Sequence, residues 1–477
     1  MRTRNIITGF FLLGFSFTGF AQTNDNKTYS LKQCVETAVA NNLDARLAGL
    51  SVQTNEANWK QSKMEMLPTL NASVGHGINQ GRSIDPYTNQ YINKQIKVAD
   101  YGASSELVLF NGLSLQNNIK RNSLDYEASK MYWQQTKDGI TISVILKYLD
   151  VMTDEELLVQ GQKQLDLTAK QVERLTTLND NGSIKPSDLS DMKGHLADDQ
   201  IAMIDKQNAL ESDKLALCKL MNIIYDKSMK LEKIDAGNVG EIYPDLPSDI
   251  YKKALTELAQ IRYRELKTKS AQKAVKVAQG QLFPRLTLNG NAGSNYSSAA
   301  SQSVFLNTAT ISTGDYIVLA GTPTPVLRDQ DNFRSDKIAY TKQLNNNIST
   351  YISLNLSIPI FNAFRQRTRV KLAKIDAKGL LMTEQTAKTQ LQQDVEQGYL
   401  DMASVYEKYK TLLVQVSSYQ ESFNAAEIRY NEGVGNSIDY LTARNNFDRA
   451  SNNLIIAKYD YIVRTKILDY YQGKLTW

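Results

Sequence analysis

Short runs of alternating apolar and polar residues are interspersed with long helix-like segments along this chain. Strict alternation over about eight or more residues is typical of β-strands with one apolar face. The pattern predicts four such strands: 69–80, 101–110, 285–296 and 351–361.

A helix is expected before each strand pair, and a longer helical pattern after it. The leading helices are predicted at 30–66 and 248–281, each followed by a proline. Ser30 and Gln33 have the spacing of a capping box, which fixes the start of the first. The longer patterns predict helical hairpins at 113–222 and 364–473. Their first arms, about 65 residues, would reach roughly 100 Å, too long for a compact globule.

Apolar residues in these long arms follow a seven-residue register. In the second half the register comprises Val395, Tyr399, Met402, Tyr406, Leu413, Val416, Phe423, Ala426 and Tyr430. A maintained 3.5-residue period indicates coiled-coil packing. An ordinary bundle core uses a similar seam and stays open as an alternative.

The two halves of the chain repeat one plan. One constant offset relates Phe110-Asn111 to Phe361-Asn362, Gly182 to Gly433 and Asp188 to Asp439. The repeat predicts four divisions: a signal peptide at 1–21, a first repeat at 22–222, a linker at 223–247 and a second repeat at 248–477. The polar stretch 297–349 is an insertion in the second half, expected to be an irregular loop at the outer surface.

The amino terminus has the pattern of an export signal. Arg2 and Arg4 precede an apolar run, 6–20, that closes on Ala21. This run is short for a membrane-spanning helix, and no other run of about 20 apolar residues follows. We therefore expect an exported chain without a transmembrane helix.

Composition excludes several classes of function. A formal charge of +5 without a clustered basic face argues against nucleic-acid binding. The only histidines, His76 and His195, occupy non-equivalent positions, and no phosphate-binding loop or nucleophile motif occurs. We predict no enzyme activity, no cofactor and no metal site. Cys34 and Cys218 leave a disulfide and two buried thiols equally open.

The predicted strands have the length of transmembrane β-strands. Because a membrane does not tolerate an open sheet edge, several chains would have to close one barrel. Phe110, Asn111, Phe361 and Asn362 would then mark the junctions at which membrane strands end and helices begin. Two soluble β-hairpins remain the alternative.

In this order, these features resemble the TolC-like outer membrane efflux channels, also called outer membrane factors. The match includes the Ile358-Pro359-Ile360-Phe361-Asn362 strand end and the Tyr430-Asn431-Glu432-Gly433 turn. The resemblance implies an α+β membrane protein: a homotrimer with a 12-stranded transmembrane β-barrel, four strands per chain, continuing into a periplasmic α-helical barrel. It would reside in the outer membrane, extend into the periplasm and contact outer membrane lipids.

The implied function is the exit duct of a tripartite efflux or type I secretion system. Substrates would pass passively from an inner-membrane pump, joined by a periplasmic adaptor (membrane fusion) protein. The alternative is a periplasmic coiled-coil structural or adaptor protein without a pore. The sequence does not indicate the exported substrate or identify the adaptor and pump.

The resemblance also implies a site at the hairpin tips. Asp188 and Asp439 match positions that ring the pore entrance in this family, and Gly182, Tyr430, Gly433 and Gly435 belong to the tip turns. Asp191, one helical turn beyond Asp188, would face the same way. An acidic ring favours cations.

Helix capping alone is the alternative for Asp188 and Asp439. With Pro186 as the first residue of one helix and Asn436 as the N-cap of the other, both aspartates fall at the third position of a helix. The chain departs from the best-known family pattern at Gly435, which replaces a basic residue, and at Thr442, which replaces an acidic one. How the closed tip is held therefore stays open.

Overall fold

The computed structural model describes most of the chain, and these residues form two compact units. The signal peptide predicted at 1–21 lies outside the described residues, which are 28–84, 89–93, 95–234 and 242–474. The described parts of 28–46, 136–254 and 393–474 form the first unit, and those of 47–135 and 255–392 form the second.

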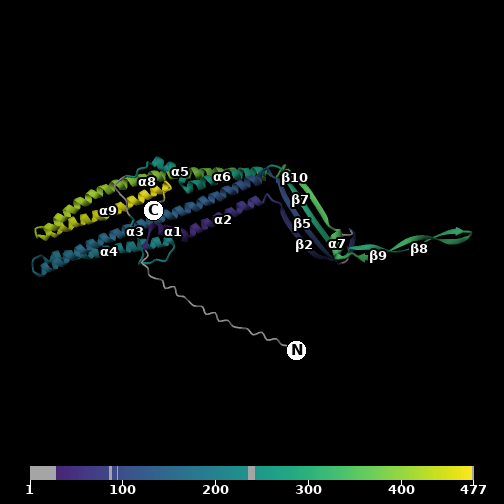
Figure 1. Ribbon diagram of the computed structural model, residues 1–477, viewed down its shortest axis with the longest axis horizontal. Coiled ribbons are helices and arrows are strands. Elements are labelled where there is room, and N and C mark those ends of the chain that lie inside the picture. Colours follow the sequence, from purple (N-terminus) through teal and green to yellow (C-terminus); the bar gives the residue numbers. More distant parts are fainter. Residues whose placement is uncertain (1–27, 85–88, 94, 235–241, 475–477) are drawn as a thin grey trace, which may run out of the picture. The chain divides into compact units, whose positions relative to one another are not determined.

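The second unit contains an antiparallel four-stranded sheet in the order β10-β7-β5-β2 (Figure 1). Its strands are β2 (Thr69–Asn79), β5 (Ile96–Phe110), β7 (Arg285–Ser297) and β10 (Ser349–Ser357). β5 begins five residues before the predicted start at 101, because its pairing with β2 continues to Ile96. β10 ends at Ser357, before the predicted 361, because Pro359 has no amide hydrogen to donate. Within the described residues, β2 and β10 each have one unpaired edge.

The insertion predicted as an irregular loop is instead a long β-hairpin. It consists of β8 (Ser301–Leu319) and β9 (Thr322–Lys337), followed by the short helix α7 (Tyr340–Asn346). Ala320 (φ 52°) and Gly321 (φ 88°) both adopt the left-handed conformation that a tight two-residue hairpin turn requires. The prediction took the polar composition of this segment as a sign of a loop. An exposed two-stranded ribbon tolerates polar residues equally well.

Each leading helix is divided in two. α1 (Leu31–Asn41) is followed by α2 (Leu43–Met64), and α5 (Pro247–Glu257) by α6 (Ala259–Gly280). The structure confirms the capping box at the start of α1. Asn42 is extended, and its side-chain oxygen accepts hydrogen bonds from the amides of Asp44 and Ala45, so that it starts a new helix. Leu258 is extended at the corresponding break.

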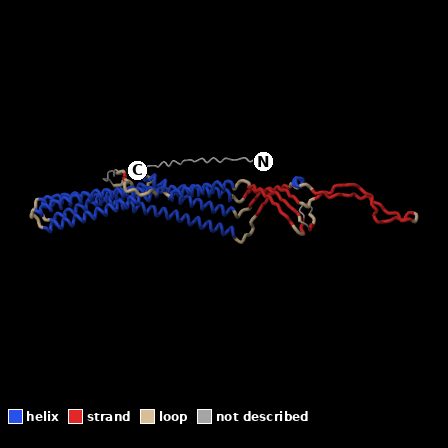
Figure 2. The backbone as a smooth tube through the Cα atoms, turned by 90° about the horizontal axis from the view of Figure 1, so that it is seen from below, coloured by secondary structure: helices blue, strands red, loops and turns tan. Residues whose placement is uncertain are grey.

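Four long helices form the helical hairpins: α3 (Ser114–Asp180), α4 (Pro186–Met221), α8 (Arg365–Asn431) and α9 (Ser437–Tyr471) (Figure 2). α3 and α8 have 67 residues each, about 100 Å at 1.5 Å per residue. None of the described helices is both long enough and apolar enough to span a membrane.

The predicted seam of α8 is largely buried, with one correction. Val395, Met402 and Phe423 are buried, but Leu413 is 44% exposed and its neighbour Leu412 is only 6% exposed. A helix drifts relative to a strict heptad, so the buried position moves by one residue here.

Short strands and buried thiols complete the described chain. β1 (Thr28–Tyr29) pairs in parallel with β6 (Lys230–Leu231), and β3 (Arg82–Ile84) pairs with β4 (Tyr91–Asn93). Cys34 and Cys218 are both free and buried in one apolar core. Burial, reinforced by the neighbouring Cys218, raises the pKa of the Cys34 thiol to about 12. The two-thiol alternative therefore holds.

Candidate functional site

One face of the four-stranded sheet is apolar and exposed. Strand register places Leu354 of β10 beside Leu288 of β7, and Leu288 beside Leu107 of β5. Leu70 on β2 is 80% exposed and Ile352 on β10 is 77% exposed. Large apolar side chains contributed by all four strands to one exposed sheet face are unfavourable in water and suited to lipid.

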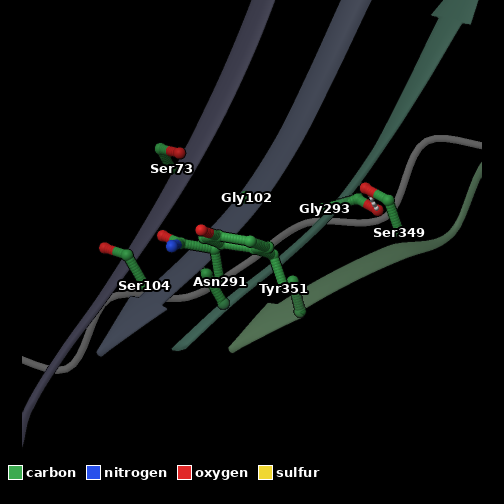
Figure 3. A pocket seen from close by; sticks show the side chains of 9 residues that line it. Ser73, Gly102, Ser104, Asn291, Gly293, Ser349 and Tyr351 are labelled. Carbon is green, nitrogen blue, oxygen red and sulfur yellow. Dashed lines mark hydrogen bonds between the residues drawn. The ribbon is translucent and has the colours of Figure 1, made fainter. Parts of the chain in front are cut away.

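The opposite face of the sheet is polar. Ser73, Ser104, Asn291 and Tyr351, one from each strand, line a hollow of about 280 Å³ on this face (Figure 3). The register aligns Gly102 with Gly293, and Gly293 with Ser349, at the same level. This face is therefore hydrophilic, with small residues that leave space above the backbone.

Aromatic side chains gather where α7 packs against the sheet. The Tyr101 hydroxyl lies 2.6 Å from the Tyr340 hydroxyl and 2.8 Å from Nε2 of His76. The Tyr296 and Tyr340 rings have centroids 4.4 Å apart. Amphipathic rings of this kind are enriched where a membrane meets water.

The junctions between strands and long helices have an unusual backbone. After Phe110 and Asn111, Gly112 (φ 66°) and Leu113 (φ 62°) are left-handed, and Asn111 Oδ1 accepts a hydrogen bond from the Leu115 amide. After Phe361 and Asn362, Ala363 (φ 50°) and Phe364 (φ 59°) repeat this conformation. Phe361 is exposed and packs edge-to-face on Phe364, with ring centroids 5.7 Å apart. The two residues after each predicted junction pair therefore form a left-handed turn that links the end of a strand to the start of a long helix.

Glycine ends the first arm of each helical hairpin. The Gly182 amide bonds to the Asn179 carbonyl and the Ser183 amide to that of Leu178. Gly433 and Val434 make the equivalent bonds to Tyr430 and Arg429. Both glycines have positive φ, which closes a Schellman motif at each helix end.

Gly435 does not have a positive φ, so backbone conformation does not explain the glycine. The constraint at this position is the space around it. A Cβ atom there would lie 3.1 Å from the Tyr430 nitrogen and 3.2 Å from the Arg429 carbonyl carbon. Its amide donates a 2.9 Å hydrogen bond to the Arg429 carbonyl. The backbone passes close to the helix end at this point, so any side chain at position 435 would require its neighbours to shift by a few tenths of an ångström.

The hairpin tips enclose a hollow of about 770 Å³. Asp188, Gly182, Tyr430, Gly433 and Gly435 all line it. Burial and the Asp188 carboxylate raise the pKa of Tyr430, against the opposing effect of Arg174. The Tyr430 ring stacks on Tyr440 at 4.9 Å, and burial raises the pKa of Tyr440 to about 12. The tip is therefore a packed aromatic structure with a carboxylate at its edge.

The three predicted acidic residues differ in position. Asp188 and Asp439 lie at the third position of α4 and α9, and the Asp439 amide donates to Asn436 Oδ1 at 2.7 Å. Asp191 and Asp439 are exposed, and neither lines the tip hollow. One protomer thus brings only Asp188 together with the tip turns.

Arg174 joins the ends of the two hairpins and was missed at the sequence level. Its guanidinium donates hydrogen bonds to both the side-chain and the main-chain oxygen of Asn431. Arg174 belongs to α3 and Asn431 is the last residue of α8. No local signal pairs residues so far apart in the chain.

A buried ionic network below the tip was also missed. Arg444 Nη2 donates to Asp199 Oδ2 at 2.7 Å and to the Gln164 carbonyl at 3.2 Å. Its Nε lies 3.3 Å from Asp448 Oδ2 without the alignment of a hydrogen bond. Burial raises the pKa of the Asp448 carboxyl more than Arg444 lowers it. One available signal is that Arg444 follows Tyr440 and Leu441 at helical spacing, on their apolar face.

We expect Arg174→Met to loosen the tip locally. Losing hydrogen bonds from a charged donor costs about 1.5–3 kcal/mol, so amides of the 432–435 turn should exchange roughly ten- to hundredfold faster. Hydrogen exchange followed by mass spectrometry measures this. Lys170→Met, on an exposed position one turn earlier, is the control. Equal exchange in both variants would mean that Arg174 does not restrain the turn.

Comparisons with known proteins agree with this arrangement. The sequence model of the family described as "Outer membrane efflux protein" matches residues 250–469. The toluene efflux pump outer membrane protein TtgC of Pseudomonas putida is 22% identical over 432 residues, covering 89% of this chain and 79% of TtgC.

Two solved structures are similar across nearly the whole fold. The outer membrane protein VceC of Vibrio cholerae superposes with a TM-score of 0.74 at 13% identity, covering 93% of this chain and 96% of VceC. CusC superposes with a TM-score of 0.75 at 15% identity, covering 93% and 92%. Residues 250–469 thus match the outer membrane efflux protein family, and the chain, with its two-faced sheet and long helical hairpins, has the fold of these solved outer membrane proteins and is similar to efflux proteins of the bacterial outer membrane.

Proposed function

We propose that the protein is the outer membrane exit duct of a tripartite efflux or type I secretion system. The observation that carries this proposal is the four-stranded sheet with one apolar face, one polar face and two unpaired edges. Such a sheet can satisfy its backbone in a membrane only as part of a closed barrel. The polar face, with Ser73, Asn291 and Tyr351, would line the bore.

A homotrimer closes this barrel. Joining the free edge of β2 in one chain to that of β10 in the next gives a 12-stranded barrel from three chains, four from each. The long hairpins would continue below it as a periplasmic α-helical barrel. Substrates would pass through the duct passively, and the protein would form or break no covalent bond. Other proteins would have to supply the energy for transport.

We propose that an inner-membrane pump supplies that energy and that a periplasmic adaptor connects it to the hairpins. Support comes from the relatives: TtgC is described as part of a toluene efflux pump. The exposed outer surfaces of α4 and α9 offer area for such a partner.

The acidic residues at the tips would form the entrance. In a trimer, Asp188 and Asp439 would supply six carboxylates near one constriction, with three more from Asp191. A ring of carboxylates favours cations in a narrow pore. Asp188 at the edge of the tip hollow supports this assignment.

Planar-bilayer conductance tests both proposals. We expect the detergent-purified protein to give small, cation-selective openings, and Asp188→Asn/Asp191→Asn/Asp439→Asn to lose that selectivity. The charge-matched control is Glu36→Gln/Asp44→Asn/Asp249→Asn, which removes three carboxylates outside the long hairpins.

The outcomes separate the duct from its entrance. If the triple variant conducts with unchanged ion selectivity, the proposal of a duct stands. The three aspartates would then not form a selective entrance, and helix capping would explain Asp188 and Asp439. A folded, membrane-inserted trimer that never conducts would contradict an open duct. Failure to insert would favour the periplasmic structural protein.

A further inference from the structure

The tip of the β8–β9 hairpin is apolar and exposed. Tyr316, Ile317, Val318 and Leu319 are all at least half exposed, and Val318 is 71% exposed. Leu327 on β9 is exposed as well. In the stretch 312–327, Asp315 is the only charged residue. We call residues 316–327 the hairpin tip.

Both faces of the ribbon are apolar at the hairpin tip. Side chains alternate between faces along a strand, so the four consecutive apolar residues 316–319 place two on each side. In the described residues, β8 and β9 pair only with each other. A two-stranded hairpin without a covering layer is marginally stable in water, so this tip needs cover on both faces.

The base of the hairpin is built differently. Thr308 Oγ1 donates to Asp331 Oδ1 at 2.6 Å, and Thr310 Oγ1 donates to Asp329 Oδ1 at 2.7 Å. Arg334 makes two hydrogen bonds to Asp336. These polar cross-strand and local pairs are satisfied within one chain and suit exposure to water. The need for a partner is confined to the hairpin tip.

Chain connectivity indicates the partner. β8 begins four residues after β7 ends, and β9 leads through α7 into β10, so the hairpin arises at one end of the sheet. The opposite ends of all four sheet strands connect to helices. In the proposed trimer, three hairpins would therefore start from one rim, which brings identical tips together.

Charge favours identical copies over other occupants. Three equal tips meeting at a symmetry axis must avoid like charges, and the stretch 316–327 carries none. An anionic lipopolysaccharide surface would call for a cluster of lysine or arginine, whereas a single basic residue, Arg328, directly follows the tip.

We propose that the three hairpin tips pack against one another and cover the outer mouth of the barrel. This inference rests on the proposed trimeric duct. The cover is an assembly of the chain with itself, formed by residues 316–327, and it leaves the hydrogen-bonded base as a porous stalk through which substrate leaves sideways.

Cysteine cross-linking in the intact protein tests the contact. Val318→Cys places a thiol in the hairpin tip, and Ser303→Cys places one near its base as the matched control. The native thiols are buried, so the wild-type chain is a blank. After native mass spectrometry has shown the trimer, a short bis-maleimide is expected to join two of the three chains of each Val318→Cys trimer as a covalent dimer, because each chain offers one reactive thiol. The other two samples are expected to stay monomeric on denaturing gels.

The failures are distinguishable. If Val318→Cys trimers react with a mono-maleimide but form no cross-link, the inference is overturned while the duct stands. Cross-links found only between trimers would assign the tip to contacts between channels and overturn it too. Monomers in the native mass spectrum would reject the trimer and the inference together.

A shortened hairpin tests the cover separately. Replacing residues 306–332 by Asn-Gly joins the paired Phe305 and Phe333 through a two-residue turn. In an intact trimer we expect an added Asn291→Cys thiol, on the polar sheet face, to react with a bulky maleimide supplied from the outer side faster than it does with the full-length hairpin. Equal reaction rates in intact trimers would refute the cover over the mouth.

Discussion

Gly112→Ala is expected to destabilise the protein by about 4 kcal/mol or more, which makes it the most damaging small substitution that the structure identifies. A Cβ atom at this position would lie 2.3 Å from the Gly280 carbonyl oxygen and 2.7 Å from Phe283 Cβ. The first of these is backbone and cannot rotate away. The left-handed φ of 66° adds strain for alanine.

The reason for this sensitivity lies in how the junction packs. The end of α6 approaches the turn so closely that Gly280 is restricted in return: a Cβ there would lie 2.7 Å from the Gly112 oxygen. Ser114 Oγ donates to the Val277 carbonyl at 3.1 Å beside them. Separating these segments to admit a methyl group would break that contact as well.

Thermal unfolding in detergent, followed by far-UV circular dichroism, measures the effect. Gly379→Ala is the matched control, because a Cβ there meets nothing within 4 Å and alanine favours a helix. We expect the control to melt at or slightly above the wild-type temperature and Gly112→Ala to melt far below it or to fail to assemble. Equal melting of the two variants would refute the close approach.

Arg444→Met should cost about 3–5 kcal/mol at neutral pH, the cost of leaving buried charges without a partner. The Arg444 side chain is only 4% exposed and lies between the Asp199 and Asp448 carboxylates. Without the guanidinium, both carboxyl groups lose the cation that lies against them in a poorly hydrated site. Methionine fills much of the volume, so electrostatics accounts for most of the loss.

This loss should shrink in acid. Burial already raises the pKa of Asp448 in the wild-type protein, and removing Arg444 raises it further. A carboxyl group whose folded-state pKa is raised costs stability when ionised, and this cost disappears as the pH falls to the unfolded value of 3.8. The melting difference between variant and wild type should therefore be smaller at pH 4.5 than at pH 7.

Two further variants isolate the charge effect. Arg444→Met/Asp199→Asn/Asp448→Asn removes the stranded charges and should regain most of the stability. Arg334→Met breaks an ion pair with Asp336 at an exposed site and should leave the melting temperature close to that of the wild type. A pH-independent loss in Arg444→Met, unrelieved in the triple variant, would show that packing rather than charge governs the site.

Local signals in the sequence predicted the structure correctly where a single residue determines where a helix or strand begins or ends. The capping box at Ser30 and the N-cap at Asn436 involve partners within three positions, and both are present. Pro359 lacks an amide hydrogen and so ends β10 early, an effect that can be read from the sequence alone. The missed features, Arg174 with Asn431 and Arg444 with Asp199, join segments that meet only after the helices have packed.

The insertion shows a different limit. Residues 301–337 are polar enough to suggest a loop, yet they form two long paired strands that contain many β-branched and aromatic residues. A polar composition indicates that a segment is exposed to water. An exposed segment can be either a loop or a β-hairpin. Asp188, Asp191 and Asp439 illustrate the same limit: their roles depend on neighbouring chains, and they stay predictions.

The unpaired edges of β2 and β10 have a consequence for biogenesis. In the proposed trimer each chain reaches the membrane with two rows of unsatisfied backbone groups, and each such group costs several kcal/mol in hydrocarbon. Stepwise insertion, one chain after another, would pass through open intermediates that carry this cost in full. In this trimer the edge strands of three chains therefore pair before or during insertion into the membrane. The insertion rate should then rise steeply with the concentration of exported chain.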